Sequence, residues 1–163
     1  MLPQVERLEA HPHIEGCTVV SYTTEQAGQW LLDVALHSVA VRGSPYRLDV
    51  KADVACATST TSQGAGLSRA TRGSESAFVI TAGDRFCNRC DEGGARFWAT
   101  LSAMPESAAR RGRPVADCEI VDCEDGTYLG LYTLPREAPS DCILRIFLDQ
   151  EQIRGSPFQI AVS

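Results

Sequence analysis

The residues with the clearest chemical potential are cysteines, and Cys87 and Cys90 form the only Cys-x-x-Cys motif of the chain. Such a pair can make half of a zinc site, a local disulfide or a thiol redox centre. The three histidines lack the spacing that would complete a zinc site, and no βαβ pattern of the thioredoxin type surrounds the motif. A disulfide between Cys87 and Cys90 and two free thiols in an exposed turn remain as alternatives, and no metal site is predicted.

Acidic residues gather in one turn, at Asp122, Glu124 and Asp125. They lack the spaced loop of oxygen ligands that calcium requires, and as catalytic carboxylates they lack a partner pocket. The sequence also has no phosphate-binding glycine loop and no nucleophile elbow. We therefore expect a protein that is not an enzyme and carries no cofactor.

Composition and charge exclude further classes. The chain has 163 residues, of which 44% are hydrophobic, and a formal net charge of −6. This acidic balance disfavours a nucleic-acid partner, because phosphate binding needs a clustered positive surface. No apolar run is long enough to cross a bilayer, so no direct membrane insertion is expected.

The segments that must position any site are short and rich in β-branched or aromatic residues. Glycine, proline or polar clusters bound each of them, and none has a sustained helical period. Residues 53–163 contain about seven such segments, which is typical of an antiparallel immunoglobulin-like β-sandwich. The fold class predicted is therefore all-β. We expect Gly126 to take a positive φ in its turn, Cys142 to be buried, and Cys87 and Cys90 to be exposed.

An internal repeat divides the chain. Arg42-Gly43-Ser44-Pro45-Tyr46 recurs as Arg154-Gly155-Ser156-Pro157-Phe158, 112 positions later. Gly16 to Tyr22 also lies over Gly126 to Tyr132, at an offset of 110. The first copy contains only the last four strand positions of a unit, so residues 1–52 are interpreted as the C-terminal half of a repeat that precedes the complete one at 53–163. Half a sandwich has open edges, and we expect residues 1–52 not to be stable alone.

The ordered motifs of residues 53–163 resemble the filamin-type immunoglobulin repeat. They are Gly64-Ala65-Gly66-Leu67, Ser76 to Ala82, Gly93-Gly94, Asp122 to Tyr128, and Ile153 to Phe158. Two features depart from the family pattern: the Cys87–Cys90 motif replaces a Gly/Asn turn, and Pro139-Ser140 replaces a glycine. The resemblance implies a non-catalytic scaffold or cytoskeletal linker in a tandem array, which contacts neighbouring repeats of its own chain. The alternative it implies is an adhesion module in a cell-surface ectodomain, as in gamete-surface proteins; location stays open.

The resemblance also implies a binding edge between the third and fourth strands, expected at 96–101 and 115–121. There a partner's extended segment would add as a further strand. The candidate contact residues are Arg96, Trp98 and Thr100 on the first strand, and Ala116, Cys118 and Ile120 on the second. Trp98 is either a partner anchor or is covered by residues 106–113 or by the half-repeat. Arg110, Arg111 and Arg113 lead us to expect a partner segment with alternating apolar residues and few positive charges.

Overall fold

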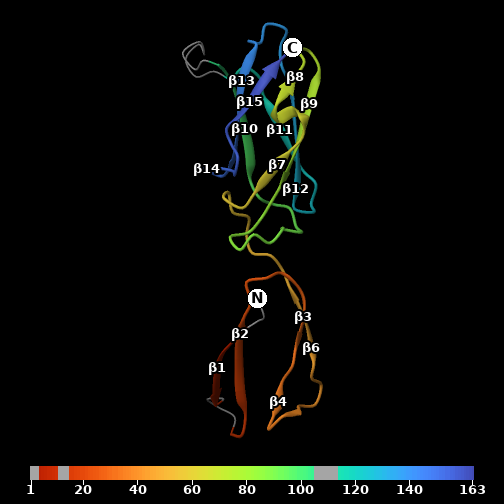
Figure 1. Cartoon of the computed structure of the whole chain (residues 1–163), viewed down its shortest axis with the longest axis vertical. Helices are drawn as coiled ribbons and strands as arrows, with labels where there is room; N and C mark the ends of the chain where they lie inside the picture. Colours follow the sequence, from red (N-terminus) through yellow and green to blue (C-terminus); the bar gives the residue numbers. More distant parts are fainter. Residues whose placement is uncertain (1–3, 11–14, 105–113) are drawn as a thin grey trace. The chain divides into compact units, whose positions relative to one another are not determined.

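The computed structural model describes residues 4–10, 15–104 and 114–163, and it is built of β-strands. The only helix in these described residues is a single 3-10 turn, Ala65–Leu67. The chain separates into two compact units, Met1–Lys51 and Ala52–Ser163, which Figure 1 colours red to orange and yellow to blue. Within the described ranges, no helix has the length and apolar character that crossing a membrane requires.

The second unit contains two β-sheets. The first has the order β11 (Cys118–Asp122), β12 (Thr127–Thr133), β9 (Glu75–Thr81) and β7 (Thr61–Gln63). The second has the order β10 (Phe97–Ala103), β13 (Asp141–Leu148), β15 (Phe158–Val162) and β8 (Arg69–Ala70), with β14 (Glu151–Gln152) paired to β13. All pairings are antiparallel except β8 with β15. The predicted all-β immunoglobulin-like sandwich is confirmed.

Side chains that point inward at every second strand position form the core between these sheets. In β12 and β13 every second residue is buried, because successive side chains of a strand point to opposite faces. The largest fully buried apolar side chains are Tyr128, Phe78, Ile80, Leu101, Leu134, Leu144, Ile146, Ile153 and Ile160. Burying each contributes about 1.5–3 kcal/mol relative to exposure. Cys142 is also fully buried, as the sequence predicts.

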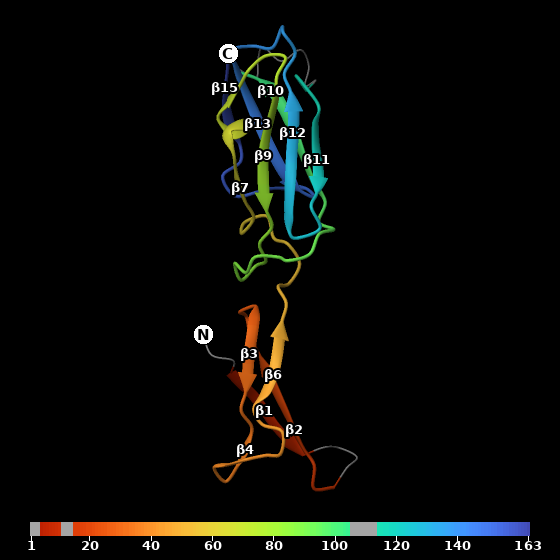
Figure 2. The same ribbon diagram turned by 90° about the vertical axis from the view of Figure 1, so that its right-hand side faces the viewer.

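The first unit consists of strand pairs. β1 (Gln4–Ala10) pairs with β2 (Thr18–Thr23), β3 (Gly28–Leu32) pairs with β6 (Tyr46–Val50), and β4 (Ala35–Leu36) pairs with β5 (Val39–Ala40). In Figure 2 the chain runs through these strands in red and orange. Each pair is a sheet of two strands among the described residues.

The pairing register of the first unit repeats that of the second. Trp30 pairs with Leu48 on β3 and β6, and Cys142 pairs with Ile160 on β13 and β15, so both partners are offset by 112. The pair of β1 and β2 matches the pair of β11 and β12 in the same way: Val20 on β2 stands where Gly130 stands on β12. The sequence repeat is therefore also a repeat of strand pairing.

Candidate strand-addition site

The candidate binding edge lies where the two sheets of the second unit approach each other. β10 is the last strand of its sheet and β11 is the last strand of the other, and the two strands are in contact. Figure 2 shows β11 at the outer edge of its sheet, beside β12 and β9. Each strand therefore has one side that no described strand of its own sheet covers.

Hydrogen bonds to β13 determine which residues of β10 face this edge. The N–H of Met104 donates to the C=O of Asp141, and the N–H of Asp149 donates to the C=O of Arg96. Hydrogen-bonded and non-hydrogen-bonded pairs alternate along an antiparallel ladder. In the observed register, the even-numbered residues of 96–104 therefore bond to β13.

The odd-numbered residues of β10 consequently direct their main-chain N–H and C=O groups toward the open edge. These residues are Phe97, Ala99, Leu101 and Ala103. Among the residues that the structure describes, one of their groups is occupied, because the N–H of Val115 donates to the C=O of Leu101 at 2.7 Å. The remaining groups form a row with the spacing that an added strand needs.

The bond from Val115 also explains where β11 begins. The sequence predicts this strand from residue 115, but it starts at Cys118. Residues 115–117 are not paired with β12 in the ladder, whose first pair is Cys118 with Tyr132. The start of the predicted strand was therefore wrong, because Val115 bonds to β10 instead.

Three of the predicted contact residues lie on the outer face of the β10 sheet. Arg96 and Trp98 are exposed and Thr100 is half-buried. The Trp98 ring stacks on Phe147 of β13, with centroids 4.2 Å apart and planes inclined by 9°. Its indole N–H also donates to the C=O of Asp149. Trp98 is thus held in one orientation while 44% of its surface stays exposed.

The other three predicted residues lie on the inner side of the same edge. Ala116, Cys118 and Ile120 are half-buried and pack against the core. Burial raises the pKa of the Cys118 thiol to about 11, so the group is neutral and behaves as a small apolar side chain. The six residues therefore do not form one surface. A strand added to β10 would have the three outer residues beside one of its faces and the three inner residues beside the other.

Sequence reasoning missed Phe147 and Asp149, which fix Trp98. Alternation alone places Phe147 on the outer face of its strand. Its position beside Trp98 depends on the register between β10 and β13, in which Trp98 pairs with Phe147. The sequence of either strand alone does not determine that register, so the contact could not be predicted from it.

The two cysteines of the Cys-x-x-Cys motif lie in different environments in this structure. Cys87 and Cys90 both carry free thiols. Cys87 is exposed, with its sulfur 3.8 Å from the hydroxyl of Ser59, whereas Cys90 is buried and its sulfur lies 3.7 Å from the C=O of Asp53. The expectation that both are exposed was wrong for Cys90, because the thiol points into the packed start of the second unit.

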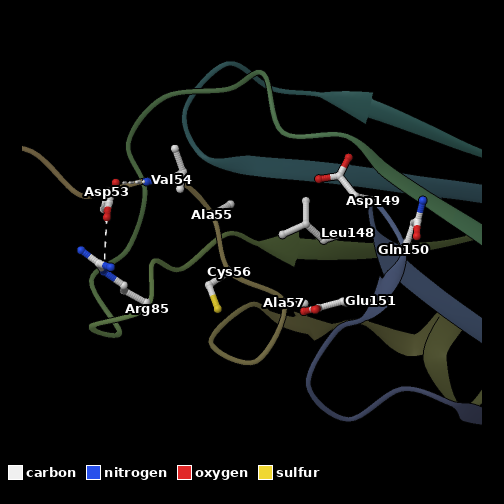
Figure 3. A pocket seen from close by; sticks show the side chains of 10 residues that line it. All are labelled: Asp53, Val54, Ala55, Cys56, Ala57, Arg85, Leu148, Asp149, Gln150 and Glu151. Carbon is white, nitrogen blue, oxygen red and sulfur yellow. Dashed lines mark hydrogen bonds and ion pairs between the residues drawn. The ribbon is translucent and has the colours of Figure 1, made fainter.

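A separate cavity of about 700 Å³ lies at that end of the second unit. In Figure 3, Leu148 and two alanines line the cavity between Asp149 and Glu151 on one side and Cys56 and Arg85 on the other. Hydrogen bonding from the Thr58 hydroxyl lowers the pKa of Cys56. No histidine lines the cavity, and the described residues contain no cluster of metal-binding side chains. The lining therefore contains a thiol but no imidazole base to activate it.

Other predicted features of the edge fall outside the described residues. They are the covering segment 106–113 and its arginines, Arg110, Arg111 and Arg113.

Comparison with known proteins relates this chain to a protein family. The Filamin/ABP280 repeat model matches residues 54–159. Tripartite motif-containing protein 2 of Bos taurus and of Homo sapiens is 36% identical over 108 residues, which cover 66% of this chain but only 13% of that protein.

Two solved structures share the fold at low sequence identity. The Lin-41 filamin domain superposes with a TM-score of 0.52 at 16% identity, covering 67% of this chain and 96% of that domain. The Escherichia coli adhesin FdeC gives a TM-score of 0.65 at 13% identity, covering 98% of this chain and 48% of that structure. Because the family model spans more than half of the sequence, the chain belongs to the filamin repeat family.

Proposed function

We propose that residues 52–163 form a protein-binding module that takes up an extended segment of a partner as an added strand on β10. Filamin repeats are a non-enzymatic family of immunoglobulin-like domains that mediate contacts between proteins. The candidate edge supports the finer proposal for this chain, because it combines hydrogen-bonding groups and an apolar lining in one place.

The observation that carries the proposal is the row of main-chain groups on Phe97, Ala99 and Ala103. These groups point away from β13 in the observed register. Main-chain groups at a sheet edge supply affinity to an added strand regardless of its sequence. The side chains that flank the strand then supply selectivity.

The flanking side chains define the chemistry of the partner segment. On the inner face, Ala116, Cys118 and Ile120 offer apolar surface without a charge. On the outer face, the segment would lie beside Trp98 and Arg96, which are exposed. Alternate residues of a strand face opposite sides. The proposed partner is therefore an extended segment with apolar residues at every second position and with few positive charges near Arg96.

Within a longer polypeptide, we propose that the module acts as a scaffold in a tandem array. The support for this is the first unit, which precedes the module in the sequence and pairs its strands β3 and β6 in the same register as β13 and β15. The adhesion alternative would use the same edge at a cell surface. Those two settings differ in redox environment, so the thiol state of the protein in its own compartment separates them.

A peptide-binding experiment tests the proposed edge. The probe is an extended peptide of about nine residues, within the usual range of strand lengths, that alternates valine with serine or threonine. Amide hydrogen exchange should slow at Phe97, Ala99 and Ala103 when the peptide binds. Ala116→Glu, which puts a charge on the inner face, should weaken binding by about tenfold or more.

Val121→Glu is the matched control. Val121 lies on the neighbouring β11 but is 41% exposed and is not among the residues packed on the core. The peptide affinity should be unchanged in this variant. Equal affinity in wild type, Ala116→Glu and Val121→Glu, with no protection on β10, would exclude the edge as the binding site.

A further inference from the structure

The first unit has an apolar face that the described residues cover only in part. β2, β3 and β6 contribute it through Val20, Tyr22, Trp30, Leu32 and Leu48, together with Leu36 of β4; we call this set the open face. None of the six is buried. Natural sheets rarely leave such edges and faces bare, because they invite pairing with other chains.

The second unit shows what these positions do when the sandwich is complete. Tyr22 is 37% exposed, whereas Tyr132 at the equivalent position is 3% exposed. Leu36 is 65% exposed, whereas the equivalent Leu148 is 7% exposed. The same strand positions therefore form core in the second unit and stay half-buried or exposed in the first.

The same comparison identifies the strands that close the face. In the second unit, β12 pairs with β9, β13 pairs with β10, and β15 pairs with β8. The equivalent strands β2, β3 and β6 each have only one partner among the described residues. Within the described part of the first unit, three edges thus lack partners of the β8, β9 and β10 type.

One contact shows that the occupant differs from this chain's own β9. In the second unit Gly130 pairs with Phe78, and a Cβ placed on Gly130 would overlap the Phe78 ring. Val20 occupies the position equivalent to Gly130. At that position a branched side chain would occupy the space that the Phe78 ring takes beside Gly130. A segment that closes the open face must therefore have a small residue opposite Val20.

We propose that the open face is an interaction surface for a segment not contained in residues 1–163, which contributes strands of the β8 to β10 type and carries a small residue opposite Val20. The relatives leave room for such a segment, because this chain covers only 13% of their length. A second copy of this chain does not fit, because its β9 would bring Phe78 against Val20. Val20 is therefore a specificity-determining residue of the surface.

The test uses the full chain and two peptide probes. One peptide has the sequence of residues 61–103, and the other has the same sequence with Phe78→Ala. The Phe78→Ala peptide should bind the wild-type chain about tenfold more tightly than the unchanged peptide, because overpacking a filled site is unfavourable. Amide exchange should slow in β2, β3 and β6 on binding.

The Val20→Gly variant of the chain provides the reciprocal test, because it removes the side chain that is proposed to exclude Phe78. It should accept the unchanged peptide, and the affinity difference between the two peptides should disappear or reverse. If the free peptides are insoluble, the same two segments are fused before Met1 through a flexible glycine–serine linker, and amide protection of β2, β3 and β6 is compared.

Three outcomes would overturn the proposal. The first is no protection of β2, β3 and β6 with either segment in either arm. The second is equal binding of both peptides to the wild-type chain. The third is concentration-dependent dimerisation in sedimentation that protects the same strands, which would assign the surface to a second copy of this chain.

Discussion

The hydroxyl of Ser156 accepts a hydrogen bond from the main-chain N–H of Ile146, at an Oγ to N distance of 3.1 Å. The first unit has the same bond at 2.9 Å, between Ser44 and Val34, offset by 112 positions in both partners. The main-chain bonds of this turn repeat as well: Val41 to Val34 matches Ile153 to Ile146. The serine of each Gly-Ser-Pro sequence thus ties the entry of the last strand to the strand beside it.

This relationship predicts the effect of removing the hydroxyl. Ser156→Ala should lower the free energy of unfolding by about 1–3 kcal/mol, because the partly buried N–H of Ile146 loses its acceptor. Urea unfolding followed by circular dichroism measures the change. Ser74→Ala, at an exposed turn position, is the control and should change stability by less than about 0.5 kcal/mol. A Ser156→Ala loss no larger than that of the control would show that water replaces the hydroxyl.

A second prediction separates two costs at glycine. Gly126 has a φ of 78°, and a Cβ there would overlap the carbonyl of Cys90. Gly73 has a φ of 74°, but nothing lies within 4 Å of its added Cβ. Gly73→Ala should cost about 1 kcal/mol from backbone conformation alone. Gly126→Ala should cost about 2–4 kcal/mol, because steric overlap adds to it. Equal losses of unfolding free energy in the two variants would contradict the overlap.

Local patterns predicted much of this fold because they act over a few residues. Alternation predicted the strands, the internal repeat predicted the burial of Cys142, and the acidic turn before Gly126 indicated its positive φ. The burial of Cys90 was not predictable in this way. It depends on a contact with Asp53, which lies 37 residues earlier.

The candidate site was predictable only in part for the same reason. The sequence indicated which side chains alternate on β10, but not that Trp98 would meet Phe147 or that Val115 would bond to Leu101. Both contacts join segments through sheet register or an irregular crossing. Such pairings are determined by how the whole sandwich closes, and no single strand contains them.

A third prediction concerns acid stability. Asp84 is 1% exposed, and burial alone would raise its pKa. Hydrogen bonds from the side chain of Asn88 and from the N–H groups of Asp53, Asn88 and Phe86 outweigh burial and lower the pKa. A lowered pKa in the folded state stabilises the fold above the unfolded value of about 4. This contribution should be lost as pH falls from about 4 through the lower folded pKa.

Asp84→Asn tests that assignment. At pH 7 the variant should lose about 1–3 kcal/mol, because its amide group turns a donor toward N–H groups. Its unfolding free energy should then fall less steeply than that of the wild type below about pH 4. Asp91→Asn changes an exposed carboxyl in the same segment and should leave the wild-type acid profile unchanged. Parallel acid profiles for wild type and Asp84→Asn would show that Asp84 is not the group responsible.

The last prediction concerns alkaline stability and uses the repeat as its control. Burial raises the pKa of Tyr132 to about 12, and its hydroxyl donates to the C=O of Gly66 at 2.6 Å. A raised pKa in the folded state stabilises the fold fully below the ordinary value of about 10, and this contribution is lost as pH rises from there to about 12. Tyr132→Phe should cost about 1–2 kcal/mol at pH 8 through the lost bond, but its unfolding free energy should fall less between pH 10 and 12. Tyr22→Phe alters the equivalent residue of the first unit, which is 37% exposed, and should keep the wild-type alkaline profile. Urea unfolding at pH 8, 10 and 11 measures these changes. An unchanged alkaline fall in Tyr132→Phe would assign the fall to the thiols of the buried Cys90 and Cys142 and the half-buried Cys118, whose pKa values burial also raises.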